Sequence, residues 1–377
     1  MKPAVLNIVT GLTSAMLVCT PSAWASKDTD PLAGATLTVY DGEGVHKIDL
    51  GKPETTNIPE NPTMTVFAGG GSHTVALTPA APIETPTTTD TPSSGYFRLT
   101  SGYRNDETSF NIASDASGNA TPNIISELTW EMPNAEIRFD AGWTHASGFT
   151  LRGHLAYART VFDGRVQDSD YALDDRQAEF SRSYSDPEGS TARDLSLGVG
   201  WRVPLAAGHV LTPMIGLARY SGHYRMRDGE QVLSNYGFGV PLGDFAGLDS
   251  TYEPEWRSGW IGLESVSRPN SRLTVRAGLK HHWFSYEADA DWNLRTTFAH
   301  PVSFRQTGHG TGWEADLGAD WAFLPQHSLT FDLSGRSLRL EDGNNVFFYA
   351  NGQSHAQQLN GVFNDSWALR LGYRFDY

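Results

Sequence analysis

The last residues of the chain, Trp367-Ala368-Leu369-Arg370-Leu371-Gly372-Tyr373-Arg374-Phe375-Asp376-Tyr377, alternate between two kinds of side chain. Trp, Leu and the aromatic residues occupy every second position, and small or charged residues fill the positions between them. Because successive side chains of a strand point to opposite faces, this pattern predicts a strand with one apolar face and one polar face. A chain that ends on an aromatic residue after such a stripe is typical of outer-membrane β-barrels.

Three earlier segments, 195–203, 272–280 and 313–323, show the same alternation and place charged residues on the face opposite the apolar one. This inward set mixes Arg with Asp and Glu, which in a narrow barrel predicts a salt-bridged interior and not a wide pore. No apolar run after residue 25 approaches the roughly 20 residues that a membrane helix needs. A membrane location therefore requires a closed barrel, in which every backbone group is hydrogen-bonded.

Connections between the predicted strands are of two lengths. Short ones, at 204–208, 268–271 and 324–326, are typical of periplasmic turns, and long polar ones, at 113–122, 163–190, 225–250, 287–308 and 341–362, are typical of extracellular loops. The predicted strands are 96–112, 123–132, 147–162, 191–203, 209–224, 250–267, 272–286, 309–323, 327–340 and 363–377. We predict an all-β fold, a ten-stranded antiparallel transmembrane β-barrel with long extracellular loops and a short N-terminal periplasmic segment.

The N-terminus has the features of an export signal. Residues 1–25 contain an early Lys, an apolar stretch and Ala23-Trp24-Ala25, the small-x-small pattern of a cleavage site. Cys19, the one cysteine, leaves with this peptide, so the mature chain is expected to lack disulfides. We therefore predict that the protein is located in the cell outer membrane.

Composition divides the rest of the chain into three parts. Residues 26–78 contain short β-like runs, 35–40, 64–68 and 74–77, and are expected in the periplasm, where they are free to contact a partner. Residues 79–94 are rich in Pro and Thr and predict an extended linker. The barrel is expected over 95–377. Loss of Lys2 with the signal changes the formal net charge from −15 to −16, which argues against a nucleic-acid partner.

The candidates for chemistry are carboxylates in the predicted loops. No Ser lies in a G-x-S-x-G setting, and His281-His282 lacks the H-E-x-x-H spacing, so a serine nucleophile and a zinc site have little support. Asp168 and Asp170, like Asp289 and Asp291, are two residues apart. In an extended segment this spacing puts both carboxylates on one face, where like charges can raise one pKa and hold a proton or a water. The alternative is that these acids are solvated or bind Ca²⁺.

Several stretches resemble the omptin family of outer-membrane proteases. Residues 128–137 (LTWEMPNAEI), continuing through Ala141-Gly142-Trp143, are similar to the second omptin strand and first periplasmic turn. Residues 163–171 (DGRVQDSDY) are similar to the segment that carries the first catalytic Asp pair. Trp260-Ile261-Gly262-Leu263, with Tyr252 upstream and residues 278–283 downstream, resembles the stretch that leads to the second pair.

The resemblance implies a ten-stranded barrel that cleaves exposed peptides or proteins at the extracellular face, with Asp168 and Asp170 as the first pair. The family's second pair is D-x-H and falls at Asp289-Ala290-Asp291, where the His is replaced. His281, His282 and His300 lack the spacing to take its place and are not assigned the role. Omptins also need lipopolysaccharide, but Leu217, Arg219 and Glu255 do not match the family's lipid-binding order. No cofactor is expected, apart from this lipid.

Three functions follow. The first is an omptin-like aspartic-type endopeptidase in which Asp168, Asp170, Asp289 and Asp291 activate a water. The second is a non-catalytic barrel of the same fold, acting as an adhesin, a receptor or an envelope structural protein; the missing His favours it. The third is a small porin, which the charged lumen disfavours. The expected partners are outer-membrane lipid and lipopolysaccharide.

Overall fold

The computed structural model describes residues 36–41, 44–49, 63–68, 71–76, 93–206, 208–237 and 241–377. The predicted signal peptide and most of the predicted linker lie outside these residues. The chain divides into two compact units, Met1–Thr89 and Asp90–Tyr377, and each is described by itself. Within the described segments, no helix is long and apolar enough to cross a membrane.

The first unit contains two antiparallel hairpins. β1 (Thr36–Asp41) pairs with β2 (Gly44–Asp49), and β3 (Thr63–Ala68) pairs with β4 (Gly71–Ala76). The three β-like runs predicted from the sequence fall on β1, β3 and β4 and are confirmed for their described residues. β2 was not predicted. The two hairpins belong to separate sheets, so the described strands do not form one small sheet.

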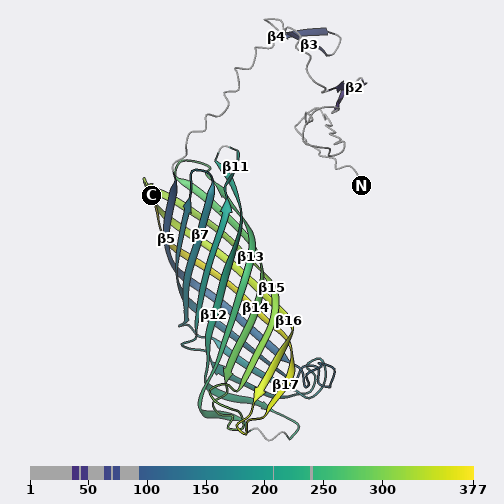
Figure 1. The fold of residues 1–377 in the computed structure, drawn as a ribbon, viewed down its shortest axis with the longest axis vertical. Helices are drawn as coiled ribbons and strands as arrows, with labels where there is room; N and C mark the ends of the chain where they lie inside the picture. The colour runs from purple at the N-terminus through teal and green to yellow at the C-terminus, as the bar shows by residue number, and fades with distance from the viewer. Residues whose placement is uncertain are drawn as a thin grey trace. The chain divides into compact units, whose positions relative to one another are not determined.

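The second unit is a closed ring of antiparallel strands that slant around a common axis (Figure 1). Its strands are β5 (Ser94–Ile112), β6 (Ser126–Thr144), β7 (Phe149–Thr160), β8 (Arg165–Tyr171), β9 (Glu179–Asp186), β10 (Thr191–Trp201), β11 (Val203–Ala206), β12 (His209–Ser234), β13 (Gly243–Ser267), β14 (Leu273–Asp291), β15 (Phe304–Leu324), β16 (His327–Phe348) and β17 (Ser354–Asp376). Pairing of β17 with β5 joins the last strand to the first strand of the ring. The predicted β-barrel is confirmed.

A cut across the ring meets ten strands at either end. Between β6 and β12, however, the two strands are different at the two ends. β7 and β10 pair with β6 and β12 at one end, and β8 and β9 take these places at the other. On β6, pairing with β8 ends at Glu131 and pairing with β7 begins at Asn134, so Pro133 lies in the gap. Proline has no N–H to donate, and at this position it therefore breaks no hydrogen bond of either ladder.

The strands extend further from the membrane than predicted. The predicted loop 163–190 is wrong over most of its length, because it contains β8 and β9. Predicted loops 225–250, 287–308 and 341–362 shrink to 235–242, 292–303 and 349–353. The predicted end of a strand at residue 132 is also wrong, since β6 continues to Thr144. In the predicted loops the outward residues are mostly polar and resemble loop residues, although the backbone keeps its pairing. The missed part of β6 instead has an apolar outward face, on which Ile137 and Phe139 are exposed.

An apolar band surrounds the ring near the short turns. Trp201, Trp313 and Trp321, on the apolar faces of the predicted segments 195–203 and 313–323, are 51%, 54% and 49% exposed. They belong to a belt of exposed Leu, Ile, Phe and Tyr on every strand around them. Such a belt with aromatic residues at its edges marks the membrane-spanning part of a barrel. We call the part beyond it, made of β8, β9 and the segments level with them, such as 126–132 and 284–291, the extracellular extension.

Candidate functional site

Asp168 and Asp170 lie on β8 in the extracellular extension, on a strand and not in a loop. Asp168 is directly opposite Leu128, and Asp170 is opposite Ser126. Leu128 is buried in the interior of the ring, as is Val166, two residues before Asp168. Because directly paired residues share a face, both carboxyl groups point into the ring. Asp168 and Asp170 therefore share one face of the strand, as the sequence spacing predicts.

The environment of this pair favours a bound proton. Burial raises the pKa of Asp168 to about 8, and the neighbouring Asp170 carboxylate adds to the shift. Burial also raises the pKa of Asp170, which the hydroxyls of Ser126 and Ser181 oppose. One buried oxygen of Asp168, Oδ1, makes no hydrogen bond with the residues that the structure describes. Two such carboxyl groups titrate as a coupled unit, so the pair keeps a proton near neutral pH.

The second predicted pair lies on β14 and points the other way. Ala288 and Ala290 are buried in the interior, so Asp289 and Asp291, which alternate with them, face outward. Asp289 accepts two hydrogen bonds from Arg305 on β15, from Nε to Oδ1 and from Nη2 to Oδ2, both at 2.7 Å. Arg305 is its direct cross-strand partner. This geometry is that of a structural ion pair between two strands.

Asp291 has a histidine partner that sequence spacing did not identify. Nδ1 of His300 lies 2.5 Å from Oδ1 of Asp291. His300 belongs to the connection between β14 and β15, which returns it to the end of β14. His300 is not two residues from an Asp, so the D-x-H spacing does not identify it. Only the path of the connection reveals this contact, and it lies on the outer face with Asp291.

The structure therefore brings Asp168 to Asp170 and His300 to Asp291, but it does not bring the two groups together. One pair points into the ring and the other points away from it, with the barrel wall between them. A water held by all four predicted carboxylates requires that they share a face. Arg295 lies in the same connection as His300. The positive charge of Arg295 favours the ionised forms of Asp168 and Asp170.

A packed aromatic core fills the interior of the extracellular extension. The rings of Trp130 and Tyr252 are stacked, with centroids 4.9 Å apart and planes 11° apart. Phe110 packs against Tyr252 with a centroid distance of 5.2 Å. The Tyr252 hydroxyl donates a hydrogen bond of 2.7 Å to Oε1 of Gln306. All four side chains are buried. The interior here is a packed protein core and not an open channel.

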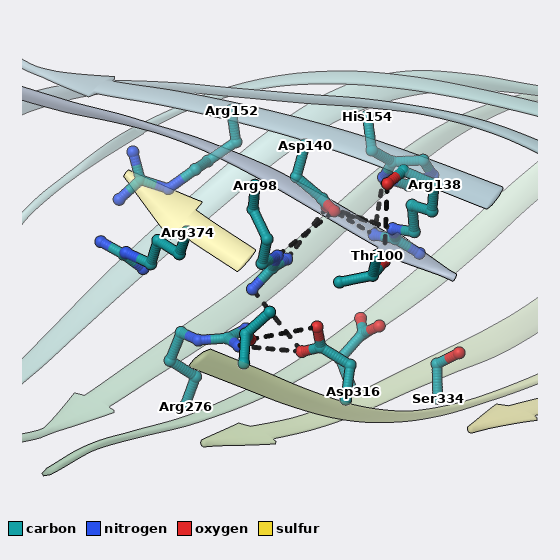
Figure 2. A network of polar contacts seen from close by, with 12 residues as sticks. Arg98, Thr100, Arg138, Asp140, Arg152, His154, Arg276, Asp316, Ser334 and Arg374 are labelled. Carbon is teal, nitrogen blue, oxygen red and sulfur yellow. Dashed lines mark hydrogen bonds and ion pairs between the residues drawn. The ribbon is translucent and has the colours of Figure 1, made fainter. Parts of the chain in front are cut away.

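Ion pairs cross the lumen within the membrane-spanning part. Nη1 of Arg104, on β5, lies 2.8 Å from Oδ2 of Asp194, on β10. Arg98 pairs with Asp140 at 3.0 Å, and Figure 2 shows Asp140 between the guanidinium groups of Arg98 and Arg138. The predicted salt-bridged interior is confirmed. Each charge is neutralised by a partner from another strand or its own strand, which is the condition for stable burial of charge.

Histidine pairs and acidic clusters do not suggest a metal site. His282 is buried and its Nδ1 lies 3.1 Å from the Ser258 hydroxyl, whereas His281 contacts the rings of Trp283 and Trp313 on the other face. Across the described part of the chain, no group of three or more His, Cys, Asp or Glu side chains is arranged to hold a metal ion.

A family model described as Pom, Protochlamydia outer membrane protein, matches residues 98–373, which is nearly the whole ring. The chain belongs to this family. Membership of the Pom family and the fold place the protein in the outer membrane, as predicted. No curated protein sequence matches the chain significantly.

Among solved structures, the Pom-family ring is similar to the outer membrane protease OmpT from Escherichia coli. The TM-score is 0.65 at 14% identity, over 76% of this chain and 98% of that chain. This likeness shows a shared fold alone, so the omptin resemblance is confirmed as an outer-membrane β-barrel and not as a protease. OprG from Pseudomonas aeruginosa matches with a TM-score of 0.33 at 12% identity, over 76% of this chain and 98% of that one.

Proposed function

We propose that this Pom-family protein is a non-catalytic outer-membrane barrel that presents its extracellular extension as a structural or binding surface. The observation that carries the proposal is the placement of the two carboxylate pairs on opposite faces of the wall. Asp289 is held by Arg305, and Asp291 by His300, so neither faces the Asp168–Asp170 pair. The omptin-type arrangement that the resemblance implied is not assembled by these residues.

The outer face of the extension supports the proposal, because cross-strand ion pairs tie it together. Arg219 and Glu255 are 2.5 Å apart, Arg225 and Asp249 are 2.6 Å apart, and Arg339 and Asp365 are 2.6 Å apart. With Asp289–Arg305 they connect neighbouring strands beyond the membrane. Each exposed pair contributes little alone, about 0.2–1 kcal/mol. Together they hold a polar surface in one shape at the cell exterior, where a partner can reach it.

The filled lumen also argues against the porin alternative. Trp130, Tyr252 and Phe110 occupy the extension, and ion pairs such as Arg104–Asp194 cross the membrane-spanning part. A conducting path would require these buried contacts to separate. We expect no steady conductance when the refolded barrel is added to planar lipid bilayers, and stable single-channel steps would contradict a closed barrel.

Complementation separates a structural role from a catalytic one. In a strain that lacks the protein, uptake of a hydrophobic dye reports the integrity of the outer membrane. We expect the wild-type chain and the Asp168→Asn/Asp170→Asn variant to restore integrity equally, since a non-catalytic barrel does not need the ionised carboxylates. Restoration by the wild type alone, at equal amounts of folded barrel in the membrane, would overturn the proposal.

An omptin-like endopeptidase is the second candidate, and the buried Asp168–Asp170 pair favours it. Two inward carboxyl groups that share a proton can hold and deprotonate a water, as in aspartic proteases. Such a site would cleave exposed peptides at acidic pH. Its test is cleavage of a quenched dibasic peptide by the refolded barrel with lipopolysaccharide between pH 4 and 8. Cleavage that the Asp168→Asn/Asp170→Asn variant loses would establish this candidate.

A lipid partner is proposed for the outer wall, just beyond the apolar band. Arg219 and Arg257 are direct cross-strand partners and share Glu255, so the local charge is positive. Arg159 and Arg193 are exposed nearby on β7 and β10 and form no ion pair with the described residues. Guanidinium groups suit bidentate contacts with lipid phosphates. These residues support lipopolysaccharide as a partner, while contact through residues 26–94 remains a prediction.

A further inference from the structure

A cavity of about 360 Å³ lies inside the ring at the end that carries the short turns. Short turns are periplasmic in outer-membrane barrels, so we assign this opening to the periplasmic side. Nine Lys and Arg residues line the cavity, against five Asp and Glu residues, although the whole chain is acidic, with a formal net charge of −15. The cavity is thus a local concentration of positive charge, and it is separate from the carboxylate pairs of the extracellular extension.

Several cations that line this cavity are neutralised by neighbouring carboxylates. Arg276 lies 2.9 Å from Asp320, and Arg374 is paired with Asp376 at 2.6 Å. Arg98 is paired with Asp140, and its Nη1, which is buried without a hydrogen bond, lies 3.6 Å from Oδ1 of Asp332. The guanidinium groups of Arg152 and Arg374 both lie against the ring of Tyr96, at 5.4 and 4.1 Å from its centroid, and in Figure 2 they point in the same direction.

Two cations near the short turns have no carboxylate partner. Arg202 follows β10 and Arg268 follows β13, and both line the cavity. Neither side chain forms an ion pair with any residue in the described part of the barrel. Arg152, which also lines the cavity, has one carboxylate partner, Glu264, at 3.2 Å. All three arginines line the same cavity, and burial, together with the charges of Arg268 and Arg152, lowers the pKa of Arg202. We call Arg152, Arg202 and Arg268 the mouth cluster.

We propose that the mouth cluster binds an anion with several oxygen atoms, a phosphate or carboxylate group, that enters from the periplasm. Three guanidinium groups with a single carboxylate repel one another, and an anion between them relieves this repulsion. Their planar donors match the oxygens of phosphate and carboxylate, with two hydrogen bonds per group. The volume of the cavity is within the range of small-molecule sites.

The test is a calorimetric titration of the full chain, refolded in detergent, with inorganic phosphate and separately with citrate. The Arg202→Gln/Arg268→Gln variant removes the two unpaired cations. Arg272→Gln is the matched control, because Arg272 is an exposed arginine at the same end of the barrel that does not line the cavity. We expect saturable binding of at least one anion, weakened by about tenfold or more in the double variant and unchanged in the control, as expected for the loss of charge-assisted hydrogen bonds.

The anion that binds more tightly identifies the source, a phosphate or a carboxylate compound. Absence of saturable binding of both anions to the wild-type chain would overturn the proposal. An equal loss of affinity in Arg272→Gln would also overturn it, since binding would then report general charge. The heat-dependent shift in gel mobility that folded barrels show verifies that each variant is folded before titration.

Discussion

Asp289 and Arg305 face each other across β14 and β15 on the outer face of the barrel, and each oxygen of the carboxylate accepts a hydrogen bond of 2.7 Å from the guanidinium group. A residue that the omptin resemblance placed in a catalytic pair thus has a cross-strand partner. The same register directs its neighbours Ala288 and Ala290 into the core. The direction of the side chain therefore separates Asp289, which forms an ion pair on the outer face, from Asp168 and Asp170, which point into the ring.

This pair is expected to contribute modestly to stability. Both side chains are partly exposed, at 31% for Asp289 and 45% for Arg305, so water screens the interaction. We expect a coupling energy of about 0.2–1 kcal/mol in a double-mutant cycle of Asp289→Asn and Arg305→Gln, measured by urea unfolding in lipid vesicles. Neither variant should alter outer-membrane integrity in complementation. A coupling energy near zero would show that the ion pair does not stabilise the extension.

The buried proton of Asp168 is expected to make stability depend on pH. Its pKa is raised to about 8 in the folded protein, whereas an unfolded Asp titrates near pH 4. Between these values the native state binds more protons than the unfolded state, so the free energy of unfolding falls as pH rises. Stability should therefore be greatest near pH 4 and decline towards pH 8, with a smaller slope in Asp168→Asn. An Asp289→Asn control should keep the wild-type slope.

The stacked pair of Trp130 and Tyr252 is expected to be a major source of stability in the extension. Trp130 is fully buried, so Trp130→Ala removes a large side chain and leaves a cavity. Core substitutions of this kind cost about 3–5 kcal/mol. Urea unfolding should show a loss in this range, and Trp283→Ala, which changes a lipid-facing ring, should show a smaller loss. Equal losses would indicate that the packed interior is not specifically important.

Arg104 is expected to be essential for the lumen network. It is buried and contacts Asp106, Glu136 and Asp194 at 2.8, 3.5 and 2.8 Å. Arg104→Leu removes one cationic partner from each of these carboxylates, although Asp194 keeps Arg336 at 3.1 Å and Glu136 keeps Arg370 at 2.9 Å. Breaking a buried ion pair typically costs about 3–5 kcal/mol. The yield of folded barrel and its urea midpoint should both fall. Arg219→Leu, an exposed arginine on the outer wall, is the control, and a similar fall there would contradict a special role for the lumen.

Much of the fold was predictable from the sequence because apolar and polar side chains alternate along each membrane-spanning strand of a barrel. Trp367, Leu369 and Leu371 alternate with smaller or charged residues, and they form the predicted strand that closes the ring. The apolar band and the Arg–carboxylate lumen follow from the same alternation. The extracellular extension was missed because its outward residues are polar, so its strands, such as β8, resemble loops in the sequence.

The sequence by itself determined the class of fold, the membrane-spanning strands other than β6 beyond residue 132, and the shared face of Asp168 and Asp170, because these depend on alternation within one strand. Only the tertiary structure decided that Asp289 points away from that pair, that Arg305 lies opposite it and that His300 returns to Asp291. Those relationships depend on where each strand ends and on the register between strands. A shift of one residue reverses the face of every side chain, and pairing across the closed ring selects the register.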